Sequence, residues 1–320
     1  MSKGKNLETA IRDAERNYSV GRILDAARDF QTISIIFAGM KDYVSAARFA
    51  AKSGDCWVKC GDPLRAAGLY ESTAQYFELL SDKDNHVIYY KKALVQCILA
   101  DRIGGRVGGV ALARNLKRAA VCQCKIDDSV PVSHYYSRAA ELFMLAGKDS
   151  QGKGLFDEGF DLYRSAAECY SQVGEYLLET RCLVEALICL NKVFENYLQY
   201  CGEEEFKEVM RREWSRFNST VEGLLKGLEL VDGLEGGILE RLMLSVVMSL
   251  NVTITLGKEN EGVMRLLGAV GRKVRDKGEG KSGLKLLENI IPSCNFSSNF
   301  VREEVIKVLE KLKDLWGGRR

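Results

Sequence analysis

The chain has 320 residues, of which 46% are apolar and 28% charged, so it can form a large core and has the composition of a soluble globular protein. Its three prolines are far fewer than the roughly 16 that average usage would give, and because proline breaks helices this scarcity favours an almost entirely helical chain. The first residues, MSKGKNLETAIRDAERN, contain no apolar signal core, so we expect no export and reduced cysteines.

The net charge of +2 is unevenly distributed along the chain. Residues 1–125 carry 20 Lys and Arg against 13 Asp and Glu, a net charge of +7. Residues 126–230 carry 11 against 19, a net charge of −8, and residues 231–320 carry 15 against 12, a net charge of +3. The basic first third indicates an acidic partner, although the solvated faces of surface helices would give the same excess.

Apolar residues recur every three or four positions along almost the whole chain, which is typical of amphipathic helices. Asp62 and Pro63 form a helix start, with aspartate as the cap and proline at the first helical position. Glycines stand at several expected helix ends, namely Gly39, Gly61, Gly147 and Gly174. The pattern predicts thirteen or fourteen helices, over residues 6–18, 22–39, 41–60, 63–81, 84–101, 106–124, 132–147, 155–174, 176–201, 203–229, 235–255, 259–277, 281–291 and 299–316.

A pattern of two alanines, two variable residues and an aromatic residue occurs four times. Paired alanines let helices approach closely, and the ring one turn later fills the space beyond them. The pattern occurs at Ala26–Phe30, Ala66–Tyr70, Ala139–Phe143 and Ala166–Tyr170, with related pairs at Ala46–Ala47 and Ala119–Ala120. Such elements belong to tetratricopeptide helix pairs, but successive copies here are 40, 73 and 27 residues apart. The sequence therefore predicts an all-α, right-handed solenoid of degenerate tetratricopeptide-like helix hairpins.

The alanine–aromatic pattern fades after about residue 230, where leucine, valine and methionine become frequent. We therefore predict a helical-hairpin solenoid over residues 1–230 and a C-terminal helical bundle over residues 231–320. The most apolar stretch, Leu242–Leu256, has 15 residues and includes Ser, Asn and Thr. Because a membrane span needs about 20 apolar residues, a buried core helix is the better interpretation.

One stretch, AGKDSQGKG, resembles a phosphate-binding P-loop. Gly147, Gly152 and Lys153 have the G-x-x-x-x-G-K spacing, but Gly154 replaces the Ser or Thr that binds magnesium. A P-loop also follows a buried strand, whereas the preceding SHYYSRAAELFML has a helical pattern. We therefore expect a loop in which Gly147 ends a helix, not a nucleotide site.

Other catalytic and metal sites find little support in the sequence. The two histidines, His86 and His134, are 48 residues apart, and the ten cysteines lack zinc-binding spacing. Cysteines on apolar faces act as small hydrophobic residues. The string Tyr89-Tyr90-Lys91-Lys92 would suit RNA, but a helix with inward Tyr and outward Lys gives the same string. We expect no enzyme activity, metal, cofactor, small-molecule substrate or nucleic acid.

Several stretches resemble the soluble NSF-attachment proteins, the SNAP adaptors of membrane fusion. The resemblance lies in ILDAARDFQTISIIFAGMKDYVSAARF at residues 23–49, in AGLYESTAQYF, and in SHYYSRAAELFMLAGK. It covers about residues 6–200. It implies a non-catalytic adaptor whose concave basic surface binds the acidic SNARE four-helix bundle and which recruits the AAA ATPase NSF to disassemble that bundle. Cytoplasmic location with peripheral association at vesicle, Golgi or ER membranes would follow.

The same resemblance implies which residues contact each partner. Two C-terminal residues, Leu315 and Trp316, are the expected contact with the ATPase. Lys153 is expected at the start of a helix that faces the SNARE partner. The full expected basic face consists of Lys91, Lys92, Arg114, Lys117, Arg118 and Lys153.

Two alternatives remain open at this point. A tetratricopeptide-like scaffold subunit of another multiprotein complex would have the same helical pattern, with its charge scattered instead of forming a stripe. An enzyme would need convergent polar groups in a deep pocket.

Overall fold

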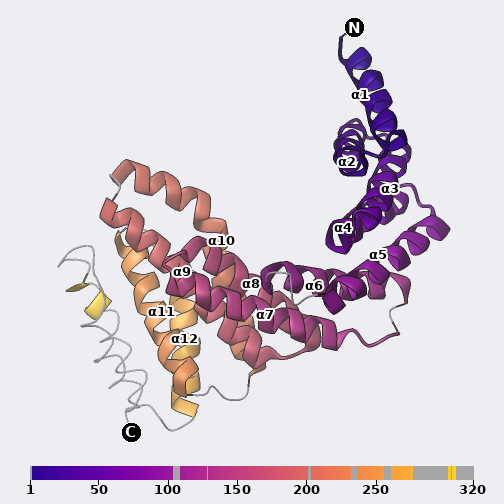
Figure 1. Ribbon diagram of the computed structural model, residues 1–320. Helices are drawn as coiled ribbons and strands as arrows, with labels where there is room; N and C mark the ends of the chain where they lie inside the picture. Colours follow the sequence, from indigo (N-terminus) through magenta and orange to yellow (C-terminus); the bar gives the residue numbers. More distant parts are fainter. Residues whose placement is uncertain are drawn as a thin grey trace. The chain divides into compact units, whose positions relative to one another are not determined.

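The computed structural model describes residues 2–103, 109–127, 129–200, 203–231, 236–255, 261–276, 302–303 and 305–307. All regular structure in this part of the chain is helical, as predicted, and consecutive helices pack against each other (Figure 1). The chain divides into two compact units, unit 1 (Met1–Leu142) and unit 2 (Phe143–Arg320). This division falls within helix α7 (Ser133–Gly152). The domain boundary predicted at residue 230 rests on the loss of the alanine–aromatic pattern and stays a prediction.

Unit 1 begins with helices of nearly equal length joined by three-residue turns. Its helices are α1 (Ser2–Ser19), α2 (Ile23–Gly39), α3 (Tyr43–Lys59), α4 (Pro63–Leu79), α5 (Lys83–Ile103), α6 (Gly109–Ile126) and the first half of α7. The first four turns each contain one residue with a positive φ, at Gly21, Lys41, Gly61 and Ser81. Each of these residues follows the previous one by 20 positions, so this part of the chain has a regular repeat. The spacing of the alanine–aromatic elements had instead predicted irregular repeats.

Each of these turns closes one helix and caps the next. The amide of Asp62 donates to the carbonyl of Trp57 at 3.0 Å, which is the Schellman bond that satisfies a free carbonyl at a helix end. The Asp62 carboxylate then accepts from the amide of Arg65 at 3.0 Å and so caps α4. Equivalent pairs of bonds occur at Asp42 and Asp82. The period of 20 residues therefore comes from a repeated turn with aspartate as its last residue.

The capping bonds also affect the acidity of these side chains. The backbone amide of Ser45 lowers the pKa of Asp42, and bonds from the side chain and amide of Asn85 lower the pKa of Asp82. A carboxylate with a lowered folded-state pKa stabilises the fold above the ordinary aspartate pKa. That contribution is lost as the pH falls through the lowered value.

The cap at Asp62 can be tested by substitution. We expect Asp62→Ala to lower the free energy of unfolding by about 1 kcal/mol, because the first turn of α4 loses its side-chain acceptor. Asp62→Asn keeps an acceptor and should retain most of the stability, although both variants lose the exposed ion pair with Arg65 at 3.4 Å. Urea denaturation followed by circular dichroism measures the difference. Equal losses in the two variants would assign the effect to the ion pair.

The core of unit 1 is built on the paired alanines. Ala26, Ala27, Ala46, Ala47, Ala66 and Ala67 are fully buried. The close approach that they allow is visible in two bonds between helices: Ser34 Oγ donates to the carbonyl of Ala46 at 2.8 Å, and Ser53 Oγ donates to that of Ala27 at 2.6 Å. The rings of Phe30 and Phe49 stack at 6.0 Å beside these contacts. The predicted role of the alanine–aromatic element is therefore confirmed here.

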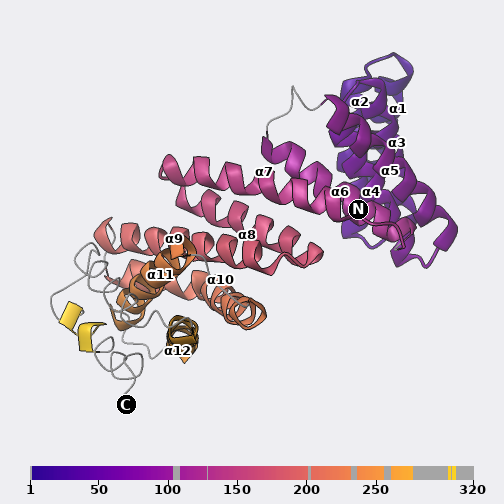
Figure 2. The same cartoon turned by 90° about the horizontal axis from the view of Figure 1, so that it is seen from below.

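Unit 2 contains the second half of α7 and the helices α8 (Phe156–Val173), α9 (Tyr176–Tyr200), α10 (Glu203–Leu230), α11 (Gly236–Thr255) and α12 (Glu261–Asp276). Figure 2 shows α8 lying alongside α9, which also packs against α10 and α11. Leu187, Leu190 and Phe194 of α9 are fully buried. The predicted helix over residues 281–291 lies outside the described residues, and of that over 299–316 only 302–303 and 305–307 are described, as helix.

The most apolar helix of the described chain is α11. Its segment Gly237–Ile254 is long and apolar enough to cross a membrane, with a mean hydropathy of 1.5, and 72% of it is buried inside the protein. Its polar groups have partners there: Asn191 of α9 donates through Nδ2 to Ser249 Oγ at 3.0 Å and to the carbonyl of Ser245 at 3.1 Å. These contacts agree with the predicted buried core helix.

Helix α7 is longer than predicted. Gly147 does not end it, and the helix continues to Gly152. A Cβ on Gly147 would lie 3.2 Å from the ring of Tyr163, so this glycine serves the close packing of α8 instead. The turn follows at Lys153 and Gly154, where Gly154 has a φ of 75°. Because a helix precedes Gly152-Lys153, the stretch lacks the strand of a P-loop.

Candidate protein-binding surface

The structure places five of the six predicted basic residues in unit 1. Lys91 and Lys92 lie on α5, and Arg114, Lys117 and Arg118 lie on α6. Lys91, Lys92 and Arg114 are exposed, whereas Lys117 and Arg118 are half-buried. These five side chains therefore differ in how far they are available to a partner.

Arg118 holds α6 against α4. Its Nε donates to Glu71 Oε2 at 2.6 Å, and its side chain and that of Glu71 are only 27% and 20% exposed. Two turns further along, Lys125 pairs with Glu78 at 2.6 Å, and Tyr90 donates to the same carboxylate at 3.2 Å. The bond from Lys125 lowers the pKa of Glu78. We conclude that Arg118 positions α6 and offers little charge to solvent.

Lys92 is held in place by aromatic rings. Its Nζ lies 4.9 Å from the ring centre of Tyr89 and 5.4 Å from that of Tyr70. Tyr70 is itself fixed, because its hydroxyl donates to Asp55 Oδ1 at 2.6 Å. Burial of the Tyr70 ring and its bond to Asp55 raise the pKa of the phenol. The result is an exposed cation whose position is set by α3, α4 and α5 together.

Lys153 lies in the turn between α7 and α8 of unit 2, not at the start of a helix as expected. It donates to Asp149 Oδ2 at 2.6 Å, and both side chains are more than 60% exposed. That bond raises the pKa of Lys153. The last two predicted contact residues, Leu315 and Trp316, lie outside the described residues.

Sequence reasoning missed three cations on α3. Lys52 Nζ lies 5.3 Å from the ring centre of Phe30 and also pairs with Glu15 of α1. Lys59 Nζ lies 4.5 Å from the ring centre of Tyr18, and the Arg48 guanidinium 5.7 Å from that of Phe49. Rings from neighbouring helices therefore fix Lys52 and Lys59, as for Lys92, whereas Phe49 belongs to the same helix as Arg48. The sequence signal that could have revealed them is the 20-residue period.

This period separates charge between the helices. Helices α1, α3 and α5 carry net charges of +1, +2 and +2, whereas α2 and α4 carry −1 each. Ion pairs join α1 to α3 and α4 to α6, so helices two apart in sequence lie side by side. We therefore name six cations of α3 and α5 the basic face: Arg48, Lys59, Lys91, Lys92 and Arg102, which are exposed, and Lys52, which is half-buried.

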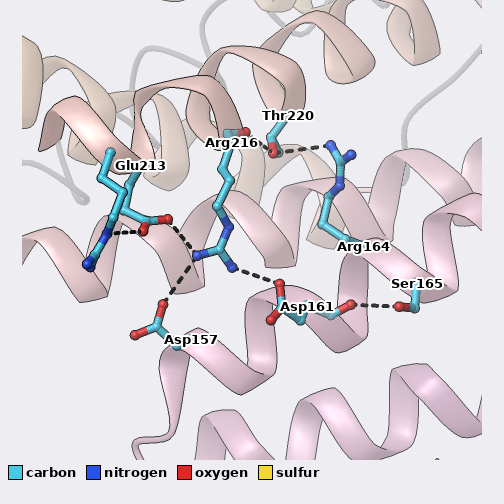
Figure 3. Close-up of polar contacts among 8 residues, drawn as sticks. Asp157, Asp161, Arg164, Ser165, Glu213, Arg216 and Thr220 are labelled. Carbon is cyan, nitrogen blue, oxygen red and sulfur yellow. Dashed lines mark hydrogen bonds and ion pairs between the residues drawn. The ribbon is translucent and has the colours of Figure 1, made fainter. Parts of the chain in front are cut away.

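In unit 2, Arg216 is held by ion pairs with three carboxylates. Figure 3 shows Arg216 of α10 between Asp157 and Asp161 of α8, at 3.5 and 2.7 Å, with Glu213 at 2.6 Å. Its guanidinium also lies 4.2 Å from the ring centre of Phe160. Burial opposes the charge, but the bonds to Glu213 and Asp161 raise the pKa of Arg216. This cluster fixes α10 on α8 and offers no open cation.

Three of the hollows among the described residues have volumes of about 180, 190 and 410 Å³. One of about 180 Å³ lies between α9 and α11, where Arg241 makes a two-bond ion pair with Glu185. Within the described ranges, no group of three or more His, Cys, Asp or Glu side chains is placed to hold a metal ion. The cysteines of the described ranges form no disulfide, and most of them are buried. Burial raises the pKa of Cys97 to about 12, which keeps this thiol protonated.

The fold and this surface define an all-α protein of consecutively packed helix pairs with a repeat-like N-terminal unit and a basic helical face. No family model matches the chain, and no curated protein matches it.

Proposed function

We propose that the chain is a non-catalytic adaptor of the SNAP type, with a right-handed tetratricopeptide-like solenoid. It binds SNARE complexes and recruits an NSF-type AAA ATPase for their disassembly. It acts in the cytoplasm and associates peripherally with vesicle, Golgi or ER membranes. The resemblance over residues 23–49 and the later alanine–aromatic stretches supports this proposal.

The observation that carries the proposal is the set of cations held on aromatic rings along α3 and α5. Rings beneath Lys52, Lys59 and Lys92 limit the conformations of these long side chains. Less conformational entropy is then lost when an acidic partner binds. A rigid row of cations on alternate helices suits a long acidic rod such as a helical bundle.

The test compares two double charge reversals in binding to an assembled SNARE bundle. Arg48→Glu with Lys91→Glu changes two exposed cations of the basic face, one on α3 and one on α5, that make no ion pair with any described residue. We expect the affinity to fall about tenfold, since each exposed charge contributes up to about 1 kcal/mol. Arg28→Glu with Lys148→Glu makes the same change in net charge at exposed positions outside the basic face and should bind like the parent.

Salt provides the second measurement. Binding by the parent protein should weaken from low to physiological ionic strength, because exposed charges are screened. Absence of binding at low salt by folded protein would contradict the proposal and favour a scaffold in another complex. Equal losses in both double variants would show that net charge alone, not the basic face, attracts the bundle.

A further inference from the structure

Helix α5 exposes a second kind of surface beside its lysines. Four large apolar side chains on it, Ile88, Val95, Leu99 and Ile103, are 48%, 53%, 40% and 49% exposed. Lys91, Lys92 and Arg102 are exposed between them. With 3.6 residues per turn, these seven residues fall within roughly one third of the helix circumference. We name them the α5 stripe.

The α5 stripe is continuous and carries positive charge only. From Asn85 to Ala100 the chain contains no Asp or Glu. Asp101, near the C-terminal end of α5, is neutralised by an ion pair with Arg138 of α7, whose guanidinium donates to Asp101 Oδ2 at 3.2 Å. The stripe runs for about 22 Å from Ile88 to Ile103, at 1.5 Å per residue. Its chemistry therefore calls for a partner that offers apolar groups and carboxylates over four helical turns.

The opposite side of α5 is buried against other helices, so α5 cannot rotate to bury the stripe. Tyr90, Ala93, Cys97 and Ala100 are each at most 1% exposed. These residues face α4 and α6, against which α5 packs. The stripe is thus the outer side of a helix whose orientation is fixed, and the rest of α5 does not shield its apolar side chains from solvent.

We propose that the α5 stripe binds a single amphipathic helix that has an apolar seam flanked by carboxylates. The apolar residues of the stripe are spaced by seven, four and four positions, which is the spacing by which helices pack side by side. An assembled four-helix bundle buries its own seams and presents mainly polar groups. A helix that is not yet assembled, or has been released, leaves its seam open. The inference rests on the proposed adaptor function for the same lysines and extends it to an unassembled helix.

The residue types of the stripe favour a helix over a lipid surface as its partner. The stripe contains no Trp or Phe, and its apolar residues are aliphatic. Segments that lie in a membrane interface typically present Trp, Phe or Leu over a broad face. A narrow aliphatic row with cations between its members instead matches the seam and flanking charges of one helix.

The experiment measures binding of labelled peptides by fluorescence anisotropy to the full chain. The probe is a helical peptide of about 18 residues, long enough to span the stripe, with leucine along its seam and glutamate beside it. One control peptide has alanine in the seam, and another has lysine in place of glutamate. We expect the leucine–glutamate peptide to bind, and we expect the affinity of both control peptides to be lower by about tenfold or more.

The matching protein variant is Val95→Ser with Leu99→Ser, which should weaken the leucine–glutamate peptide about tenfold and leave the assembled bundle unaffected. Ile35→Ser, at a residue of α2 that is 62% exposed, should bind the peptide like the parent. Circular dichroism confirms that each variant is folded. Unchanged peptide binding by the Val95/Leu99 variant overturns the inference without affecting the proposed function, which fails only if the bundle itself does not bind. Vesicles of phosphatidylserine and phosphatidylcholine form a separate arm, and stripe-dependent binding to them without peptide binding assigns the surface to lipid.

Discussion

Replacing Gly54 by valine is expected to lower the free energy of unfolding of unit 1 by about 3 kcal/mol, through overpacking of a close helix crossing. Gly54 lies in α3 beneath Tyr70 of α4. A Cβ at this position would lie 2.8 Å from Tyr70 Cε1 and 2.9 Å from Cδ1. Valine adds two further methyl groups at the same place, so either the ring or the helix must move.

The ring of Tyr70 cannot move away at low cost. Tyr70 is 5% exposed, its hydroxyl is bonded to Asp55, and Lys92 lies over its face. Displacing the ring therefore breaks a buried contact, a hydrogen bond and a cation–π contact together. Alanine at position 54 should have a smaller effect, because its better helix propensity offsets about 1 kcal/mol of the clash.

The matched control is Gly39→Val. Gly39 is also helical, but nothing lies within 4 Å of a Cβ built there. This variant should be close to the parent in stability. Urea denaturation measures all three variants, and hydrogen exchange of the α3 and α4 amides locates the loss. A Gly54→Val protein as stable as Gly39→Val would mean that α3 and α4 do not cross as closely as the structure shows.

The Gly54 variant also connects stability to the proposed surface. Tyr70 sets the position of Lys92, so a displaced ring would release a cation of the basic face. The Gly54→Ala protein should therefore bind the SNARE bundle more weakly than its stability loss alone explains. Rigid placement of the cations, not only their number, is what the rings contribute.

The amino-acid pattern was sufficient for the helices but not for the turns between them. Periodicity placed the ends of α2, α4 and α8 within two residues of those observed. Glycine is the sequence signal for a left-handed residue after a helix, and Gly61 and Gly174 carried it. Lys41 and Ser81 adopt the same conformation without glycine. Two of the first four turns therefore lack a glycine that would predict them, and the 20-residue period could not be recognised from glycine positions.

The candidate surface was predictable only in outline, for a similar reason. A basic first third of the chain can be read from composition, and exposed Lys91 and Arg114 agree with it. The pairing of Arg118 with Glu71 joins residues 47 positions apart, and helical periodicity gives no information about such pairs. The rings beneath Lys52 and Lys59 likewise come from other helices. Which cations are fixed and which are open depends on packing between helices.

Replacing Phe194 by alanine is expected to lower the free energy of unfolding of unit 2 by about 4 kcal/mol, the largest effect we predict. Phe194 of α9 is fully buried, and its ring centre lies 6.1 Å from that of Phe217 of α10. Phe217, also fully buried, stacks in turn on Trp214 at 5.2 Å. Removing the Phe194 ring leaves a cavity among helices that pack on both sides of α9, and such cavities close only in part.

Phe194→Leu is the matched control, because leucine retains much of the buried volume and should cost less than half as much as alanine. Hydrogen exchange should show the loss of protection in α9, α10 and α11, which share this core. If α2 to α4 retain their protection in Phe194→Ala, the two compact units unfold separately, and binding of the α5 stripe to its peptide should persist. Simultaneous loss of protection in all of these helices would instead mean that the chain folds as one cooperative body, in which damage to the core of α9 also removes the basic face.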